Sequence, residues 1–168
     1  MEWLFYPVDD RRLIRNRFDC GIPELNEYLK KYARQNHQKG IASTWVAVSK
    51  DETWQVAGYY SLSMAEIKRE SLPTADRKGL PRYPLPAIRI GKLAVTRSRQ
   101  GQRLGETLLV DAFNRGIRIS KEIGVLGITV DSLNEQAKAF YLKYGFIPLE
   151  DNKYSLFLPM KRILKILG

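Results

Sequence analysis

The sequence has few of the residues that stabilise secreted proteins or anchor membrane proteins. Its single cysteine, Cys20, cannot form an internal disulfide bond, so a reducing compartment is favoured. No stretch approaches the roughly 18 consecutive apolar residues that a membrane-spanning helix needs. Residues 1–10 lack the basic and then apolar order of a secretion signal. We therefore expect a soluble, cytoplasmic protein, and 168 residues fit one domain spanning 1–168.

Positive charge, in contrast, is plentiful and unevenly placed. The net charge is +10, and a surplus of +8 falls on residues 68–103. Solubility alone is one explanation of a basic protein, but a cluster rich in arginine is what a phosphate-rich partner selects. The candidate nucleic-acid-binding residues of this segment are Lys68, Arg69, Arg77, Lys78, Arg82, Arg89, Lys92 and Arg97.

Turn residues and hydrophobic periodicity divide the first half of the chain. Pro23 suits the first position of a helix, and apolar residues recur after it at helical spacing. Four prolines between 71 and 86 exclude regular strand pairing, and a long loop of this kind is often functional. The elements expected up to residue 86 are a helix from 23 to between 36 and 40, a hairpin of strands 44–48 and 55–64, and a loop over 71–86.

The second half alternates strands and helices, which indicates an α/β domain with a mixed sheet. Gly124 and Gly145 are expected to end the two helices. The expected elements are strands at 87–95, 125–130, 146–149 and 154–158, helices at 104–121 and 135–143, and a basic amphipathic tail at 161–167. The tail either packs on the body, which is the favoured interpretation, or touches an acidic partner.

A strand, a basic turn with glycines and a helix follow one another over residues 93–105. Glycine lets the backbone approach a ligand, and the first N–H groups of a helix lack partners and lie at its positive end. The turn from Gln100 to Gly105 therefore predicts a cradle for a pyrophosphate, although an ordinary connection remains the alternative. The glycine fingerprint of dinucleotide-binding folds and the Gly-Lys-Ser/Thr of P-loops are absent.

A second group of residues lies around the short helix at 135–143. Ala137, Phe140 and Tyr141 share one side at i, i+3 and i+4 spacing, between Asn134 and Gly145. Tyr141 is either a functional phenol or an ordinary core aromatic.

Over residues 87–149 the two groups together resemble the GNAT superfamily of N-acyltransferases. The resemblance implies a mixed, mostly antiparallel central sheet flanked by helices, acetyl-CoA as co-substrate and no metal. In that family the pattern Gln/Arg-x-x-Gly-x-Gly/Ala holds the coenzyme pyrophosphate; Gln100 and Gly105 match it, whereas Arg103 replaces the middle glycine. A cation there could also pair with a phosphate. The family's Phe-Tyr matches Phe140 and Tyr141, with the tyrosine as general acid. The implied coenzyme-binding residues are Leu93, Ala94, Val95, Gln100, Gly101, Gln102, Arg103, Leu104, Gly105, Asn134 and Phe140.

A narrower resemblance covers nearly the whole chain. Residues 17–29, 57–62 and 92–95, with the proline-rich loop, look like the GNAT toxins of type II toxin–antitoxin pairs. This resemblance implies acetylation of the α-amino group of aminoacyl-tRNA, which stops translation. It also implies a ribbon–helix–helix antitoxin and a homodimer.

The expected chemistry agrees with such an acceptor. A backbone N–H of residues 93–95 can polarise the thioester carbonyl, and Tyr141 can protonate the thiolate. The strand 87–95 contains no Asp, Glu or His, and we expect the only histidine, His37, at the surface. An α-amine with a pKa of about 8 needs little help from a base, whereas lysine, at about 10.4, needs much more. Glu66 and Asp131 remain open as bases.

Two other functions stay open from the sequence. One is a GNAT enzyme acting on a small amine or a protein N-terminus, and the other is an inactive GNAT fold that binds RNA or protein. The aromatic residues expected in the core rather than as stacking platforms are Trp45, Trp54, Tyr59, Tyr60 and Tyr83.

Overall fold

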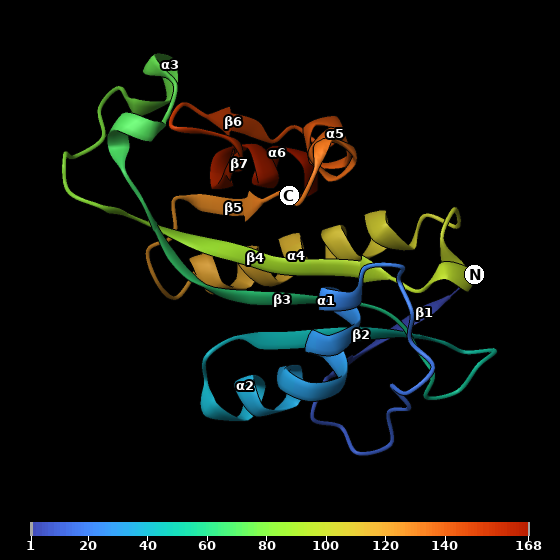
Figure 1. The fold of residues 1–168 in the computed structure, drawn as a ribbon. Coiled ribbons are helices and arrows are strands. Elements are labelled where there is room, and N and C mark those ends of the chain that lie inside the picture. Colours follow the sequence, from blue (N-terminus) through green and yellow to red (C-terminus); the bar gives the residue numbers. More distant parts are fainter. Residues whose placement is uncertain (1, 168) are drawn as a thin grey trace. The chain divides into compact units, whose positions relative to one another are not determined.

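The computed structural model describes residues 2–167, which form a mixture of helices and strands (Figure 1). The strands are β1 Trp3–Pro7, β2 Ser43–Ser49, β3 Val56–Ile67, β4 Leu85–Val95, β5 Gly127–Asp131, β6 Ile147–Leu149 and β7 Asn152–Pro159. The helices are α1 Pro23–Glu27, α2 Ala33–Lys39, α3 Thr74–Arg77, α4 Leu104–Ser120, α5 Glu135–Lys143 and α6 Met160–Leu167.

The strands within residues 2–167 are hydrogen-bonded in the order β1-β2-β3-β4-β5-β7-β6. β4 and β5 are parallel, and they pair from Ala87 to Ile90. The pairs β1–β2, β2–β3, β5–β7 and β6–β7 are antiparallel. The fold class expected from the sequence, an α/β fold with a mixed and mostly antiparallel sheet, is confirmed.

The chain divides into two compact units. The first contains the residues up to Ser63 together with Gly91–Ala112, and the second contains Met64–Ile90 together with the residues from Phe113 onward. β3, β4 and α4 each contribute residues to both units. The expectation of one domain over 1–168 stays a prediction.

In the first unit, a helical segment packs on the strands β2 and β3. Pro23 starts α1, a π-helical turn Tyr28–Tyr32 continues it, and α2 ends at Gly40, whose φ of +75° suits glycine. Leu29 is fully buried and belongs to the same apolar cluster as Val46 and Tyr59. This packing explains why the apolar residues of the segment recur at helical spacing.

Gly58 of β3 lies directly beneath the first half of α4. A Cβ atom at this position would lie 2.9 Å from Leu108 Cδ1 and 3.1 Å from the carbonyl oxygen of Ala94. No side chain fits at such distances without moving its neighbours. The absence of a side chain therefore fixes how closely α4 approaches β3 and β4 in this unit.

In the second unit, β5, β7 and β6 form a sheet region with α5 and α6 beside β7. An apolar cluster includes Leu72 from the proline-rich segment and Phe157 from β7. This segment is less irregular than expected, because it contains a 3₁₀ turn at Arg69–Ser71 and the short helix α3. The tail forms α6, and buried Ile163 anchors it, so the expected packing on the body is confirmed within this unit.

The structure also corrects the expectations for the N-terminal residues and for Tyr83. β1 was absent from the elements expected from the sequence. Tyr83 is 66% exposed and lies outside the core, whereas Tyr59 and Tyr60 are fully buried, and Trp45 and Trp54 are half-buried.

None of the helices within the described residues combines the length and apolar character required to cross a bilayer.

Candidate functional site

The turn between β4 and α4 has the backbone geometry expected of an anion cradle. Gly101 and Arg103 both have positive φ, +81° and +62°, so the backbone reverses just before the helix. The first bond of the helix joins the Thr107 amide to the Arg103 carbonyl at 3.1 Å. The amides of Leu104 and Gly105 precede that bond, so they have no acceptor in the helical ladder and can serve an anion.

Arg103 occupies the position where the family pattern has glycine, and it keeps the left-handed conformation that glycine favours. The replacement therefore changes the side chain but not the path of the turn. The Arg103 side chain is exposed and has no carboxylate partner within residues 2–167.

The turn is held in place by the segment at 19–26. The Arg97 amide donates to the Asp19 carbonyl at 2.8 Å, and the Gln100 side-chain amide donates to the carbonyls of Val95 and Cys20 at 2.9 and 3.2 Å. The Gln100 side chain thus holds the turn, and its predicted contact with a coenzyme stays a prediction. Gln102 likewise donates to the Ser98 carbonyl, at 3.4 Å.

Asp19 and Asn26 fix the conformation of the supporting segment. Asp19 Oδ1 accepts from the Gly21 amide and from Asn26 Nδ2, both at 2.9 Å, and Asn26 Oδ1 accepts from the Cys20 amide at 2.8 Å. The bond from Gly21, followed by the bond from Asn26, lowers the pKa of the Asp19 carboxyl. Gly21 has a φ of +91°, and a Cβ there would lie 3.1 Å from Arg97 Nε.

The end of β4 carries the predicted oxyanion donors. The hydrogen-bonded register with β5 ends at Ile90, so residues 91–95 extend β4 beyond that pairing. Leu93 and Val95 are half-buried and Ala94 is buried. Their predicted contact with the thioester stays a prediction.

Tyr141, in the second unit, is held in an aromatic cluster. Its side chain is 6% exposed and lies edge-on to Phe140 and Phe146, with ring centroids 5.2 and 5.4 Å apart. Burial raises the pKa of the Tyr141 phenol above its ordinary value. The phenol oxygen makes no hydrogen bond to any of residues 2–167, so the side chain combines a buried ring with a hydroxyl free for a ligand. This geometry favours a proton donor that stays protonated at neutral pH.

Two neighbours of Tyr141 have roles that the sequence did not reveal. Asn134 caps α5, because its Oδ1 accepts from the Ala137 amide at 2.8 Å. Its predicted contact with coenzyme stays a prediction. Tyr144 is half-buried and lies edge-on to Phe140, with ring centroids 5.1 Å apart. It is a second phenol, three residues after Tyr141 in the sequence.

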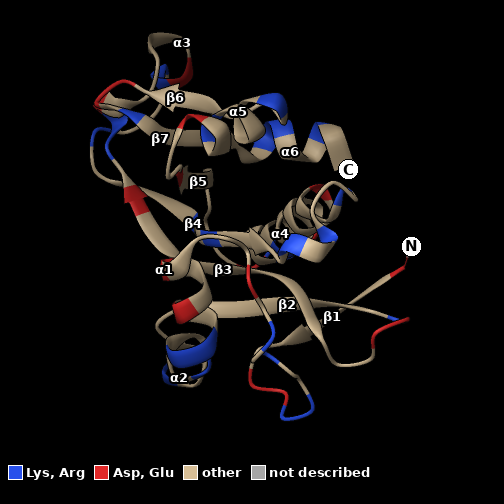
Figure 2. Cartoon of the chain, turned by 45° about the vertical axis from the view of Figure 1, so that its right-hand side comes forward, with Lys and Arg blue, Asp and Glu red and all other residues tan. Residues whose placement is uncertain are grey.

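The basic residues of 68–103 are divided between the two units. Lys92, Arg97, Arg99 and Arg103 belong to the first, and the others belong to the second. In Figure 2 the ribbon near α3 contains both acidic (red) and basic (blue) positions, and further basic positions lie on α5 and α6. The sequence segment is therefore not the sole source of positive surface.

Several of these cations already have partners. Lys92 Nζ lies 4.1 Å from the centroid of the Tyr28 ring, and Arg69 donates to the Leu80 carbonyl. Arg77 is half-buried, with Nη2 near Thr74 and Glu150. The exposed side chains, which are the most accessible to phosphates, are Lys68, Lys78, Arg82, Arg89 and Arg97.

The candidate bases are distributed as follows. His37 is half-buried instead of at the surface; its Nδ1 accepts from the Thr44 amide at 3.0 Å, and its ring lies edge-on to Trp45. This bond gives His37 a structural role. Glu66 and Asp131 are exposed, and Asp131 accepts from Ser155 at 2.7 Å. Within residues 2–167, no group of three or more His, Cys, Asp and Glu side chains is placed to hold a metal ion.

A family model described as an acetyltransferase (GNAT) domain matches residues 20–164. The chain is 33% identical over 151 residues to a tRNA-acetylating toxin of Mycobacterium tuberculosis, covering 90% of this chain and 89% of that protein.

Two solved structures are similar over almost their full length. AtaT in complex with acetyl-methionyl-tRNAfMet has a TM-score of 0.92 and 34% identity, with coverage of 99% of this chain and 100% of that one. A tyrosine-to-phenylalanine mutant of the AtaT toxin, bound to the C-terminus of the antitoxin AtaR and acetyl-CoA, has a TM-score of 0.82 and 32% identity, with coverage of 99% and 98%.

Proposed function

Because the chain belongs to the GNAT acetyltransferase family, we propose that it transfers the acetyl group of acetyl-CoA to the α-amino group of an aminoacyl-tRNA and so blocks translation. The observation that carries the coenzyme assignment is the turn before α4, where Gly101 and Arg103 reverse the backbone and leave helix-start amides unbonded. The likeness to a tRNA-acetylating toxin over 90% of the chain supports the acceptor.

The proposed reaction is a direct attack by the amine on the thioester. The N–C bond forms, the C–S bond breaks, and the amine loses a proton to solvent. The departing thiolate takes the phenol proton of Tyr141, which later recovers one from solvent. This phenol carries its proton at neutral pH, and burial, which raises its pKa, makes it a weaker acid than a free phenol, so the transfer depends on the basicity of the departing thiolate. Amides at Leu93–Val95 are the proposed donors to the carbonyl oxygen.

The proposed acceptor is an α-amine because the site offers few side chains that could act as a general base and deprotonate it. Strand β4 contains no Asp, Glu or His, and His37 is engaged with Thr44. An α-amine with a pKa of about 8 is partly neutral at physiological pH, whereas a lysine amine at about 10.4 is almost wholly protonated. A tRNA ester also provides the phosphates that the exposed basic side chains suit.

The same proposal includes the protein's partners. We infer that an antitoxin with a ribbon–helix–helix fold neutralises the enzyme, that the enzyme forms a homodimer, and that it acts in the cytoplasm, where charged tRNA is found. The AtaT relative bound to its antitoxin supports the first of these inferences.

A direct assay tests the function. Labelled acetyl-CoA is incubated with total charged tRNA, with deacylated tRNA and with lysine-containing peptides. Label confined to charged tRNA, and lost with Tyr141→Phe, is the expected result. Labelled peptide beside unlabelled tRNA would instead indicate an enzyme for small amines or protein N-termini. No label on any acceptor, with no thermal shift on adding acetyl-CoA, would indicate an inactive binding module.

A further inference from the structure

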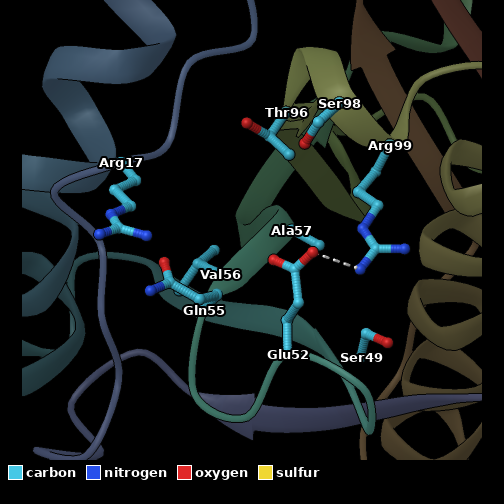
Figure 3. Close-up of a pocket in the computed structure, with 9 residues that line it drawn as sticks. All are labelled: Arg17, Ser49, Glu52, Gln55, Val56, Ala57, Thr96, Ser98 and Arg99. Atoms are coloured by element: carbon cyan, nitrogen blue, oxygen red, sulfur yellow. Dashed lines mark hydrogen bonds and ion pairs between the residues drawn. The ribbon is translucent and has the colours of Figure 1, made fainter.

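A small polar pocket lies within the first unit, beside the turn that precedes the cradle (Figure 3). Its volume is about 140 Å³. Figure 3 shows Arg17 and Arg99 on opposite sides of it, with Thr96 and Ser98 above. The lining residues are Arg17, Ser49, Glu52, Gln55, Val56, Ala57, Thr96, Ser98 and Arg99.

The size of the pocket restricts what it can hold. A water molecule takes about 30 Å³ of liquid volume, so the pocket has room for only a few waters. Pockets that enclose a whole cofactor or drug-sized ligand usually measure about 300–1,000 Å³. A nucleoside or a complete coenzyme is too large, whereas one compact group such as a phosphate fits.

The charge of the pocket favours an anion. Arg99 is only 11% exposed and bonds Glu52 at 2.9 Å, so these two charges offset each other. Arg17 is exposed and has no carboxylate partner within the described residues, which leaves one uncompensated positive charge.

Neutral donors accompany that charge. The Ser98 hydroxyl and the Gln55 side-chain amide also make no hydrogen bond within residues 2–167. The Thr96 hydroxyl is different, because Asp19 already engages it. A guanidinium, an amide and a hydroxyl together form a donor set typical of phosphate recognition.

We propose that this pocket binds a single phosphate group, separate from the amides at the start of α4. The inference rests on the proposed function, which supplies two sources of a phosphate ester. One is the backbone of the tRNA acceptor, and the other is the 3′-phosphate of the coenzyme. Arg17 begins the segment 17–29 that resembles the GNAT toxins, and Ser98 lies in the turn leading to the cradle.

Binding measurements test the pocket without requiring catalysis. An acceptor-stem RNA duplex and adenosine 3′,5′-bisphosphate are each titrated into the wild type, Arg17→Gln and the control Arg11→Gln. Arg11 is an exposed arginine that precedes Arg17 in the chain and does not line the pocket. We expect Arg17→Gln to weaken one probe about three- to tenfold, as the loss of a partly exposed charged contact should. The control should change both affinities less than twofold.

The two probes distinguish the sources. A loss confined to the duplex assigns the phosphate to tRNA, and a loss confined to the bisphosphate assigns it to the coenzyme. Ser98→Glu places a carboxylate in the pocket and should weaken the same probe at least as much. Equal affinities of all three proteins for both probes, or no binding of either probe to the wild type, would overturn the proposal. If the Arg17 effect appears while charged tRNA receives no acetyl group, the pocket stands and the proposed function fails.

Discussion

The side-chain amide of Gln100 donates a hydrogen bond to the backbone carbonyl of Cys20 at 3.2 Å. This bond joins two residues that lie 80 positions apart in the chain. One belongs to the segment 17–29 that resembles the toxins, and the other to the turn from Gln100 to Gly105 that forms the cradle. The segment 17–29 therefore helps to hold the turn in position. This gives a physical basis to the resemblance between this segment and the toxin sequences.

Removing one polar group from that support should weaken coenzyme binding. Asn26→Ala removes the acceptor of the Cys20 amide and a donor to Asp19. We expect a loss of about 1 kcal/mol in the free energy of unfolding and a several-fold higher KM for acetyl-CoA. Denaturant unfolding and steady-state kinetics measure both. Asn16→Ala, at an exposed position of the preceding segment, should change neither; an unchanged KM in Asn26→Ala would contradict the supporting role.

Loss of the Tyr141 hydroxyl should affect turnover more than binding. Tyr141→Phe keeps the ring and its contacts with Phe140 and Phe146, so the fold should persist. Without a proton donor for the thiolate, kcat should fall about 10²- to 10⁴-fold, with little change in the KM for acetyl-CoA. Tyr144→Phe is the matched control and should retain most of the activity. Equal losses in the two variants would show that the general acid is not specifically Tyr141.

Arg103 separates backbone strain from side-chain function. A non-glycine residue at a φ of +62° costs about 1 kcal/mol, so Arg103→Gly should raise the melting temperature. If the guanidinium pairs with a coenzyme phosphate, the KM for acetyl-CoA should rise several-fold in the same variant. Arg103→Ala removes the cation but keeps the strain, so it should raise KM without the gain in stability. An unchanged KM in both variants would limit Arg103 to a backbone role.

Alkaline pH should destabilise the protein through two buried phenols. Burial raises the pKa of Tyr59 and Tyr141 in the folded state, whereas in the unfolded chain both ionise at about pH 10. Their contribution to stability is complete below that pH and declines as pH rises above it. Melting temperatures from pH 8 to 11 should fall with a slope that Tyr141→Phe reduces. An identical slope in wild type and variant would contradict the raised pKa of Tyr141.

The sequence predicted the segments whose local signals agree with their packing. The helix at 135–143 was predicted with the bounds that it has, because Gly145, with a φ of +95°, follows it; the cap by Asn134 at its other end became visible only in the structure. β1 escaped prediction for a physical reason. All five of its residues are half-buried, as in an edge strand, so Trp3–Pro7 shows no alternation of apolar and polar residues.

Much of the candidate site could be named from the sequence, but the tasks of its side chains could not. Gln100 matched a family pattern and Asn134 was among the implied coenzyme-binding residues, yet their side chains bond to the protein itself. Arg17 belonged to the segment 17–29 that resembles the toxins but was given no role, because the pocket it lines combines residues from distant segments. A sequence motif records which residue types recur, whereas contacts between residues that are distant in the sequence are seen only in the structure.

A substitution at Gly58 is expected to inactivate the enzyme without altering any residue that the proposed mechanism places in contact with a ligand. Alanine there would press on the end of the Leu108 side chain and on the carbonyl of Ala94, so these neighbours of the cradle would have to shift. If the protein halts growth as proposed, cultures that survive its forced expression should accumulate replacements at this codon. The protein in these survivors would keep its charged surface residues, and its loss of activity would come from altered packing around position 58.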